Sequence, residues 1–374
     1  LGVGAGMASN MLASAVSAQG AVKGGMLRAG LQGGESTNTL DPALAASEVP
    51  AEVNYAWGEP LVEVGLDGSL EPRLASDISS SPDAKSWSFK VRSGVTFSNG
   101  KSLTADDIKA TIERHTDENS QSGALGIVQG IESIDVSGDM VTLNLHTPNA
   151  DLPYLMADYH LLIQPNGGKD DPTAGIGTGP YTVEINEPGV RHAFKKNPNY
   201  WDSDYGHADE VEILVIKDNT ARIAALQSGQ VDMINRVDPK VVNLLRRDAN
   251  VQIKNVAGRG HYVFIMHCNA EPFANNDMRM ALKYAINRQE MVDKILGGLG
   301  TAGNDFPINA AYPLFDAGIE QREYDPDKAA FHYKASGHDG SPIVLRAANA
   351  AFPGAVEAAQ LFQQSAAAAG IPLE

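Results

Sequence analysis

Two hydrophobic patterns alternate along this chain, and the alternation limits the folds open to it. Apolar residues recur at every second position in 86–97, as in a half-buried strand. In 104–115 they recur at helical spacing through Ile108 and Ile112, behind a capping box that starts at Thr104. Such patterns follow each other up to a helix that is expected to end at Gly370. The order predicts a mixed α/β architecture, in which helices cover sheets.

Length, charge and cysteine content narrow the class of protein. A chain of 374 residues is too long for one ordinary core, so two or more domains are expected. A net charge of −17 repels phosphate backbones, so nucleic acid is not expected as a partner. Cys268 is the single cysteine, which excludes an internal disulfide framework and a multi-cysteine zinc site. It lies in an apolar run and is expected to be an inert core residue.

The start of the chain has the composition of a secretory signal. Residues 1–18 are small, mostly apolar and uncharged, and Val16-Ser17-Ala18 matches a small-residue cleavage site before Gln19. Residues 1–18 are therefore interpreted as the remnant of a signal peptide without its basic beginning. The alternative is a buried helix rich in alanine and glycine. No later window holds the ~18 uninterrupted apolar residues of a membrane span, so an exported, soluble protein is expected.

A glycine-rich stretch, GIGTGPYTVEINEPGVRHAFKKNPNYWD in 175–202, raises the question of a phosphate loop. A phosphate loop places its glycines before a helix and follows them with a lysine and a hydroxyl residue. Here two alternating strand patterns follow, joined by a turn at Pro188-Gly189, and Pro180 removes a backbone donor. The glycines, Gly177 and Gly179 among them, are therefore predicted to form a tight turn with positive φ. The stretch is interpreted as scaffold.

The same stretch resembles a signature of the family 5 extracellular solute-binding proteins, the dipeptide- and oligopeptide-binding components of ABC importers. Four further blocks are similar to the family's pattern in the same order, and the resemblance runs from about Lys23 to the end. These blocks begin with EPLVEVGLDG, ALQSGQVDMI, PFANNDMRMALKYAINR and YDPDKAAFHYKASG. Several ordered blocks make a more specific signal than any one of them.

The resemblance implies a two-lobed periplasmic-binding-protein fold of type II, in the larger three-domain variant. Lobe one would span 23–260 with an inserted subdomain, and 261–374 would begin lobe two, which is incomplete in this chain. A buried strand at 261–269 would cross between the lobes. A periplasmic monomer is implied, which would bind a small molecule or peptide between its lobes and deliver it to a permease in the inner membrane. No cofactor is implied.

Candidate ligand contacts come from three segments. The loop LQGGESTNTLDP matches the segment that lines the cleft in the family, although it also suits an ordinary connection. Aromatic side chains before the glycine-rich stretch could stack on a ligand, or simply pack in the core. The expected crossing strand adds two positions near the hinge. The candidates are Gly34, Glu35, Ser36, Thr37, Tyr159, His160, Tyr262 and Asn269.

Enzymatic functions are less favoured by the sequence. His267 and Cys268 would point to opposite faces of a strand, and Asp204, His207 and Asp209 suit a solvated loop, so no metal site is expected. The chain lacks the G-x-S-x-G elbow of a serine hydrolase. Its many carboxylates leave a glycosidase open. No catalytic residue is assigned. Peptides are the leading solute, with nickel chelates, opines and oligosaccharides as alternatives.

Overall fold

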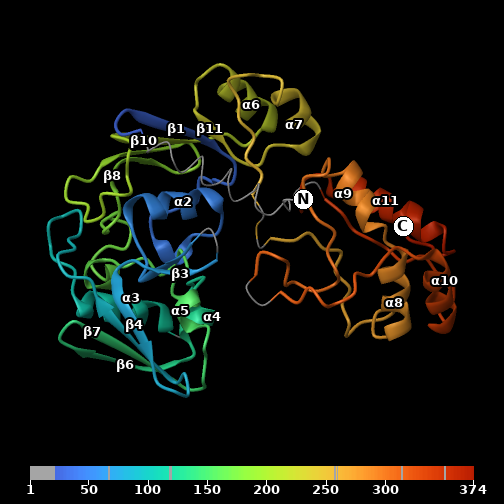
Figure 1. Cartoon of the computed structure of the whole chain (residues 1–374), viewed down its shortest axis with the longest axis horizontal. Coiled ribbons are helices and arrows are strands. Elements are labelled where there is room, and N and C mark those ends of the chain that lie inside the picture. The colour runs from blue at the N-terminus through green and yellow to red at the C-terminus, as the bar shows by residue number, and fades with distance from the viewer. Residues whose placement is uncertain are drawn as a thin grey trace, which may run out of the picture. The chain divides into compact units, whose positions relative to one another are not determined.

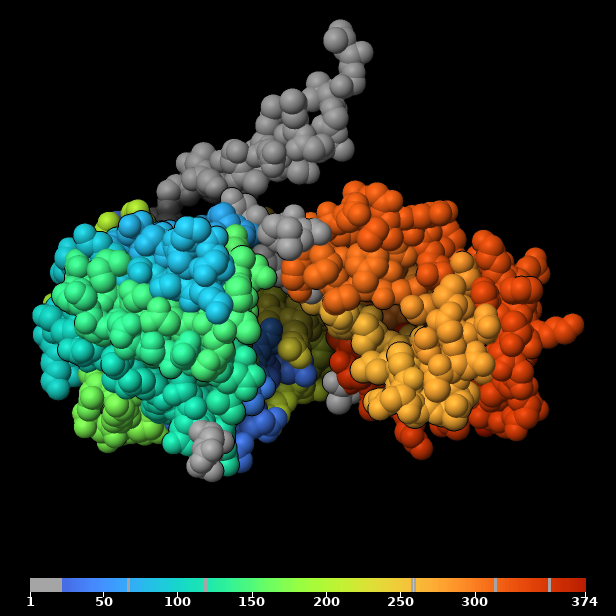
Figure 2. Space-filling model, turned by 90° about the horizontal axis from the view of Figure 1, so that it is seen from below, coloured from blue at the N-terminus to red at the C-terminus, as the bar shows by residue number. Residues whose placement is uncertain are grey.

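The computed structural model describes residues 22–65, 68–117, 120–256, 258, 260–312, 315–348 and 351–374. The predicted signal remnant, 1–18, and Gln19 lie outside this part of the chain. The chain divides into two compact units, of which the first ends at Arg236 and the second begins at Val237 (Figure 1). In Figure 2 the first unit is coloured from blue to yellow-green and the second from yellow to red. The division falls inside the 23–260 segment that the sequence assigned to lobe one, and the assignment to lobes stays a prediction.

A five-stranded sheet forms one layer of the first unit. Strand β1 is parallel to β10 and to β11, its two neighbours, and β9 and β8 extend the sheet antiparallel beyond β10. The hairpin expected in the glycine-rich stretch is confirmed as β8 and β9. In sheet order the strands are β11 (Met233–Ile234), β1 (Met26–Leu31), β10 (Glu210–Val215), β9 (Arg191–Lys196) and β8 (Tyr181–Glu187).

Helix α2 (Glu48–Trp57) lies between this sheet and the part of the first unit that contains β3 and α3 (Figure 1). Val49, Val53 and Trp57 recur at every fourth position, so they share one face of the helix, and all three are fully buried against the sheet. Helix α6 (Asn219–Gln227) connects β10 to β11 and packs on β1 and β11.

A four-stranded antiparallel sheet, with helix α3 (Ala105–Thr116) packed on it, forms the second part of this unit. The expected capping box is present, since Thr104 Oγ1 accepts from the Asp107 amide and the Asp107 carboxylate accepts from the Thr104 amide. Ile108 and Ile112 are buried against the sheet, as the helical spacing predicts. The strands in order are β4 (Ala75–Ser80), β5 (Ser86–Val91), β7 (Met140–Leu145) and β6 (Ile131–Ser137). The shorter elements are β2 (Val62–Val64), β3 (Leu70–Pro72), α4 (Leu125–Val128), α5 (Leu152–Leu155), η1 (Pro42–Leu44) and η2 (Pro165–Gly168).

The glycine-rich stretch packs on the end of α2, and the prediction of positive φ at Gly177 and Gly179 is wrong. Gly175 has a positive φ, but the other two glycines do not. They are required because the chain passes too close to Trp57 for a side chain. A Cβ would lie 2.4 Å from the Trp57 carbonyl oxygen at Gly177 and 2.5 Å from the Trp57 carbonyl carbon at Gly179. The Gly179 amide donates to the same oxygen at 2.9 Å.

Glu59 and Arg73 form a buried ion pair near β2 and β3, and the loop after the hairpin packs on it through Tyr200 and Trp201. Glu59 accepts from the Arg73 guanidinium at 2.6 Å, from the Tyr200 hydroxyl at 2.8 Å and from the Trp201 indole at 2.9 Å. The Arg73 guanidinium also lies over the rings of Tyr205 and Trp201, at 4.4 and 5.0 Å from their centroids. Burial favours the neutral form of Arg73, but the Glu59 carboxylate outweighs this and raises the pKa of Arg73.

In the part of the second unit that the structure describes, the named elements are helices, and irregular segments connect them. Helices α8 and α10 pack together, with α11 against both, around a core that includes Met278, Leu282, Ala329 and Phe362. The predicted helix starts at Asn287 and Asp325 are confirmed, since each side chain accepts from the amide three residues on. The helices are α7 (Pro239–Leu245), α8 (Asn276–Ala285), α9 (Arg288–Lys294), α10 (Pro326–Ala335) and α11 (Ala355–Ala367). None of the described helices is long and apolar enough to cross a membrane.

The strand expected at 261–269 is not formed. Residues 260–267 join no ladder and 268–269 lie in a turn, so this backbone is irregular. The expected burial is only partial, because Phe264 and Met266 pack against the core while Val263 and Ile265 are 50% and 72% exposed. Alternation shows which side chains face the core, but it does not supply the hydrogen-bonding partner that a strand needs. Cys268, which was expected in the core, is exposed and lies in the turn at 268–269.

Replacing Gly177 by Ala should lower the free energy of unfolding of the first unit by about 1–3 kcal/mol, because the new Cβ would overlap backbone atoms of Trp57. Gly126→Ala is the matched control, since a Cβ at Gly126 meets nothing within 4 Å. All three tryptophans lie in this unit, so urea unfolding followed by tryptophan fluorescence measures both variants. Equal stability of the two variants would contradict the close-approach account.

Arg73→Ala should lower the same free energy by about 3–5 kcal/mol, because the Glu59 carboxylate would stay buried without its cation. Lys101→Ala removes an exposed cation in the same unit and should change stability little. A loss in Arg73→Ala no larger than in the lysine control would show that Glu59 is hydrated or protonated in the folded protein.

Candidate functional site

The carboxyl ends of the three parallel strands in the first unit lie at one edge of the sheet. Leu31 of β1 is in register with Val215 of β10, and Gly30 is in register with Ile234 of β11. In open α/β sheets, ligands commonly bind outside the carboxyl ends of the strands. The loops that leave this edge are therefore the best candidate for a site in this unit.

The loop after β1 is held closely by its neighbours. The Gly33 carbonyl accepts from the Ser47 hydroxyl at 2.6 Å and from the Val49 amide at 3.3 Å. A Cβ on Gly34 would lie 2.9 Å from both methyl groups of Val215, so only glycine fits there. The turn at Gly189 packs against the loop, since a Cβ there would lie 2.7 Å from the Ser36 amide nitrogen. This packing presents a loop of fixed course at the edge of the sheet.

Three predicted contact residues, Glu35, Ser36 and Thr37, are exposed on this loop, while Gly34 is buried beneath them. The Asn38 side chain accepts from the Glu35 amide at 2.6 Å and closes the turn. The Glu35 carboxylate lies 2.5 Å from the Lys217 ammonium, which follows β10. Exposed ion pairs of this kind contribute little to stability, so either partner is available to a competing charged group.

The buried side chain of Arg222 forms hydrogen bonds with the loops at this edge. It is 1% exposed, and burial lowers the pKa of its guanidinium, which nevertheless stays charged. It donates to the carbonyls of Ile216 and Lys217 at 2.8 and 2.9 Å, to the Gln32 side chain at 3.2 Å and to the Arg236 carbonyl at 3.4 Å. One side chain thus contacts the chain just after β10, β1 and β11.

Asn235 and Glu48 complete this arrangement. The Asn235 side chain accepts from the Gln32 amide at 2.9 Å and donates to the Glu48 carboxylate at 2.7 Å, which also pairs with Arg236. Sequence reasoning missed Arg222 and Asn235. The position of Arg222, three residues before the apolar Ala225, could have indicated its burial, because this spacing places both side chains on the same face of α6.

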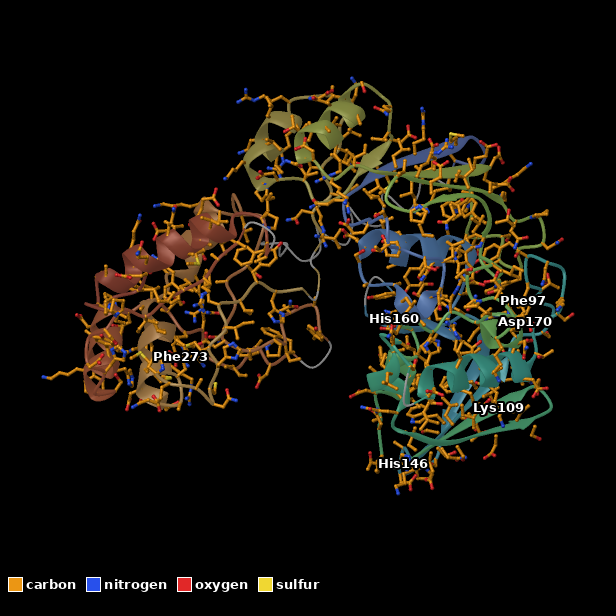
Figure 3. All side chains as sticks on the ribbon, turned by 180° about the vertical axis from the view of Figure 1, so that it is seen from behind. Phe97, Lys109, His146, His160, Asp170 and Phe273 are labelled. Atoms are coloured by element: carbon orange, nitrogen blue, oxygen red, sulfur yellow. The ribbon has the colours of Figure 1, made fainter. Side chains whose placement is uncertain are left out.

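Tyr159 and His160 belong to a different neighbourhood of the first unit. His160 is buried, with Nδ1 2.6 Å from the Asp158 carboxylate and Nε2 2.7 Å from the Ala45 carbonyl oxygen. Figure 3 shows His160 beside the blue ribbon of the segment that contains η1. The half-buried Tyr159 ring lies 4.1 Å from the imidazole, and burial raises the pKa of its hydroxyl. Both ring nitrogens of His160 are therefore engaged in hydrogen bonds within the protein.

The remaining predicted contacts, Tyr262 and Asn269, lie in the second unit. The Tyr262 ring is 55% exposed and stacks on Phe352 at 4.5 Å between centroids. Asn269 is exposed in a turn. An exposed aromatic face and an exposed amide are both chemically able to contact a solute.

A hollow of about 130 Å³ lies beside the buried Glu59–Arg73 pair. Its lining includes Tyr55, Glu63 and Tyr205. The Arg73 donors are already taken by carboxylates and by Tyr200, so the hollow offers a ligand little unused hydrogen-bonding capacity. We assign it a structural role. Among the residues that the structure describes, no three His, Cys, Asp or Glu side chains are grouped so that they could hold a metal ion.

Three comparisons place the chain among known proteins. The model of "Bacterial extracellular solute-binding proteins, family 5 Middle" matches residues 69–374. The chain is 26% identical to the oligopeptide-binding protein OppA of Bacillus subtilis over 313 residues, covering 76% of this chain and 56% of OppA. It is 26% identical to the glutathione-binding protein GsiB of Escherichia coli over 313 residues, covering 82% and 60%. The chain thus spans about three fifths of the length of these relatives.

A solved structure agrees with the mixed α/β fold expected from the sequence. The binding protein AgaA of A. tumefaciens R10, in complex with agropinic acid, matches with a TM-score of 0.76 and 25% identity. The match covers 94% of this chain and 72% of AgaA.

His115, near His160, gives a pH dependence with a definite sign. Burial, and then the Arg114 charge, lower the pKa of His115 to about 4 from an ordinary 6.5, so the folded protein holds it neutral. Its contribution to stability is full above pH 6.5 and is lost as pH falls toward 4, by about 3 kcal/mol in all. His115→Gln should abolish this part of the acid dependence in urea unfolding, whereas His146→Gln, at an exposed position, should not. Parallel acid profiles for the two variants would refute the assignment.

Proposed function

The chain belongs to the bacterial extracellular solute-binding proteins of family 5, and we propose that it captures a small solute in the periplasm for an ABC importer. The family binds solutes and is not a family of enzymes, in agreement with the expectation from the sequence. The solute would lie between two lobes, and its contacts to both would shift the protein from an open to a closed state. A change from mostly open to mostly closed takes about 5.5 kcal/mol of differential binding. A permease in the inner membrane would recognise the closed state.

We propose a zwitterionic di- or oligopeptide as the solute. The observation that carries this choice is the pair of opposite exposed charges, Glu35 and Lys217, at the carboxyl edge of the parallel strands. A peptide amine and carboxylate could each replace one partner of this weak pair and form charge-assisted hydrogen bonds. Gly34, Ser36 and Thr37 would supply the close backbone approach and the hydroxyl groups beside it. Tyr159, Tyr262 and Asn269 would add contacts, with His160 behind Tyr159.

Other solutes remain alternatives within the same function. The relatives named above bind oligopeptides, glutathione and agropinic acid, and all three ligands carry carboxylates. A nickel chelate or an opine would use Lys217 in the same way, whereas an oligosaccharide would depend on exposed aromatic rings instead. A hydrolase is less favoured, because the chain belongs to a family of solute-binding proteins.

Binding is tested with purified full-length protein and a panel of trialanine, glutathione, nickel–histidine, agropinic acid and maltotriose. A ligand that binds only the folded state stabilises it by about 2.7 kcal/mol at 100 times its Kd, so thermal unfolding identifies binders and calorimetry gives the Kd. Trialanine should bind. Binding of another member of the panel alone would change the solute class, and no binding by any member would count against capture of these solutes.

Glu35→Gln should weaken trialanine binding by roughly tenfold or more, because a charge-assisted hydrogen bond to the peptide amine is lost. Glu132→Gln on β6 is the matched control, since it removes an exposed carboxylate from the other sheet of the same unit. The two variants should unfold at similar temperatures. Equal Kd values for both would remove Glu35 from the site.

A further inference from the structure

The hydrogen bonds of His160 define its protonation state. The side chain is 9% exposed and places Nδ1 2.6 Å from Asp158 Oδ1 and Nε2 2.7 Å from the Ala45 carbonyl oxygen. A carbonyl oxygen can only accept a hydrogen bond, so Nε2 donates. An ionised carboxylate also only accepts, so Nδ1 donates as well. An imidazole that donates from both nitrogens carries a positive charge.

The carboxylate of Asp158 is ionised in this setting. Burial by itself would raise the pKa of Asp158, but hydrogen bonds from the His160 ring and amide outweigh it and hold this pKa below its usual value. Burial likewise disfavours the charged imidazole, but the hydrogen bond and charge of Asp158, with the Ala45 carbonyl, raise the pKa of His160. The two shifts support one ion pair.

The neighbouring elements add only weaker electrostatic influences. From α3, His115 is neutral near pH 7 and Arg114 is paired with Asp41, which precedes η1. From α2, Tyr55 donates its hydroxyl to the Ala157 carbonyl at 3.2 Å. Tyr159 lies beside the ring, and Asp158 is the carboxylate in direct contact with it.

The His160 ring also packs so closely on the chain at Gly123 that it leaves no room for a side chain there. A Cβ on Gly123 would lie 2.3 Å from Nε2 of His160, so the imidazole packs directly on this glycine. The Gly123 amide donates to the Ala43 carbonyl at 3.0 Å. His160 thus holds three separate segments together, around Ala43–Ala45, Gly123 and Asp158.

We propose that His160 is a buried imidazolium that fastens the 41–45 segment to the 157–161 segment, and that loss of one proton releases this connection. A neutral imidazole could donate to Asp158 or to Ala45 but not to both. The inference rests on the geometry around the imidazole and stands apart from the proposed function.

The direction of the pH effect follows from the raised pKa. The stability that His160 contributes is fully present below its ordinary pKa of 6.5 and is lost as pH rises through the folded value. This is opposite in sign to the effect of His115, which is lost as pH falls. His115 and His160 should therefore be distinguishable in one titration.

The test is a nitrogen-15 NMR titration of the histidine rings in the whole chain. At pH 6.5 both ring nitrogens of His160 should give signals of protonated nitrogen, and its midpoint should lie above 6.5. His115 should stay neutral at the same pH and serves as the internal control. A signal from an unprotonated ring nitrogen of His160 at pH 6.5 would overturn the proposal.

Asp158→Asn tests the origin of the charge. It keeps an oxygen acceptor but removes the carboxylate, so the His160 midpoint should fall toward or below 6.5, while that of His115 should move little. Amide exchange at Gly123 should then be faster than in the unchanged protein at pH 7. An unchanged His160 midpoint would overturn the ion-pair account, and if the variant does not fold, the titration of the unchanged protein decides alone.

Discussion

The loops at the carboxyl ends of the parallel strands depend on one buried guanidinium. Parallel strands have no hairpin to join their ends, so the loops at their carboxyl edge must be fixed by something else. Arg222 does this by donating to the chain beyond β10, β1 and β11 at once. Removing it would leave several loop acceptors without a donor beneath the surface, and the exposed residues above would lose their common support.

Local patterns in the sequence predicted the elements whose causes are local. The hairpin at 181–196, the capping box at Thr104 and the helix starts at Asn287 and Asp325 all follow from residues a few positions apart. The predictions failed where the cause lies far away in the chain. Glycine is required at Gly177 and Gly179 because the chain passes close to Trp57, more than a hundred residues earlier. The run 261–269 has an apolar pattern typical of a strand, but it pairs with no other strand.

The candidate site shows the same division. Glycines after the first strand, together with the resemblance to a cleft-lining segment of the family, marked the loop at 34–37, and the structure places that loop at the carboxyl edge of the sheet. The sequence could not reveal that Lys217 pairs with Glu35 or that Ala45 accepts from His160, because both contacts join distant segments. A buried histidine and an exposed one look alike in sequence, since only their surroundings fix their protonation.

The position of β1 between β10 and β11 has a consequence for how the protein is made. Both of its neighbours come from much later in the chain, and contacts just before and within β1 join residues 184 and 204 positions apart. A ribosome must therefore synthesise the chain as far as β10 before the first strand gains a partner. Sheets that pair over such distances form slowly, because closing a long loop comes before any gain from the contact.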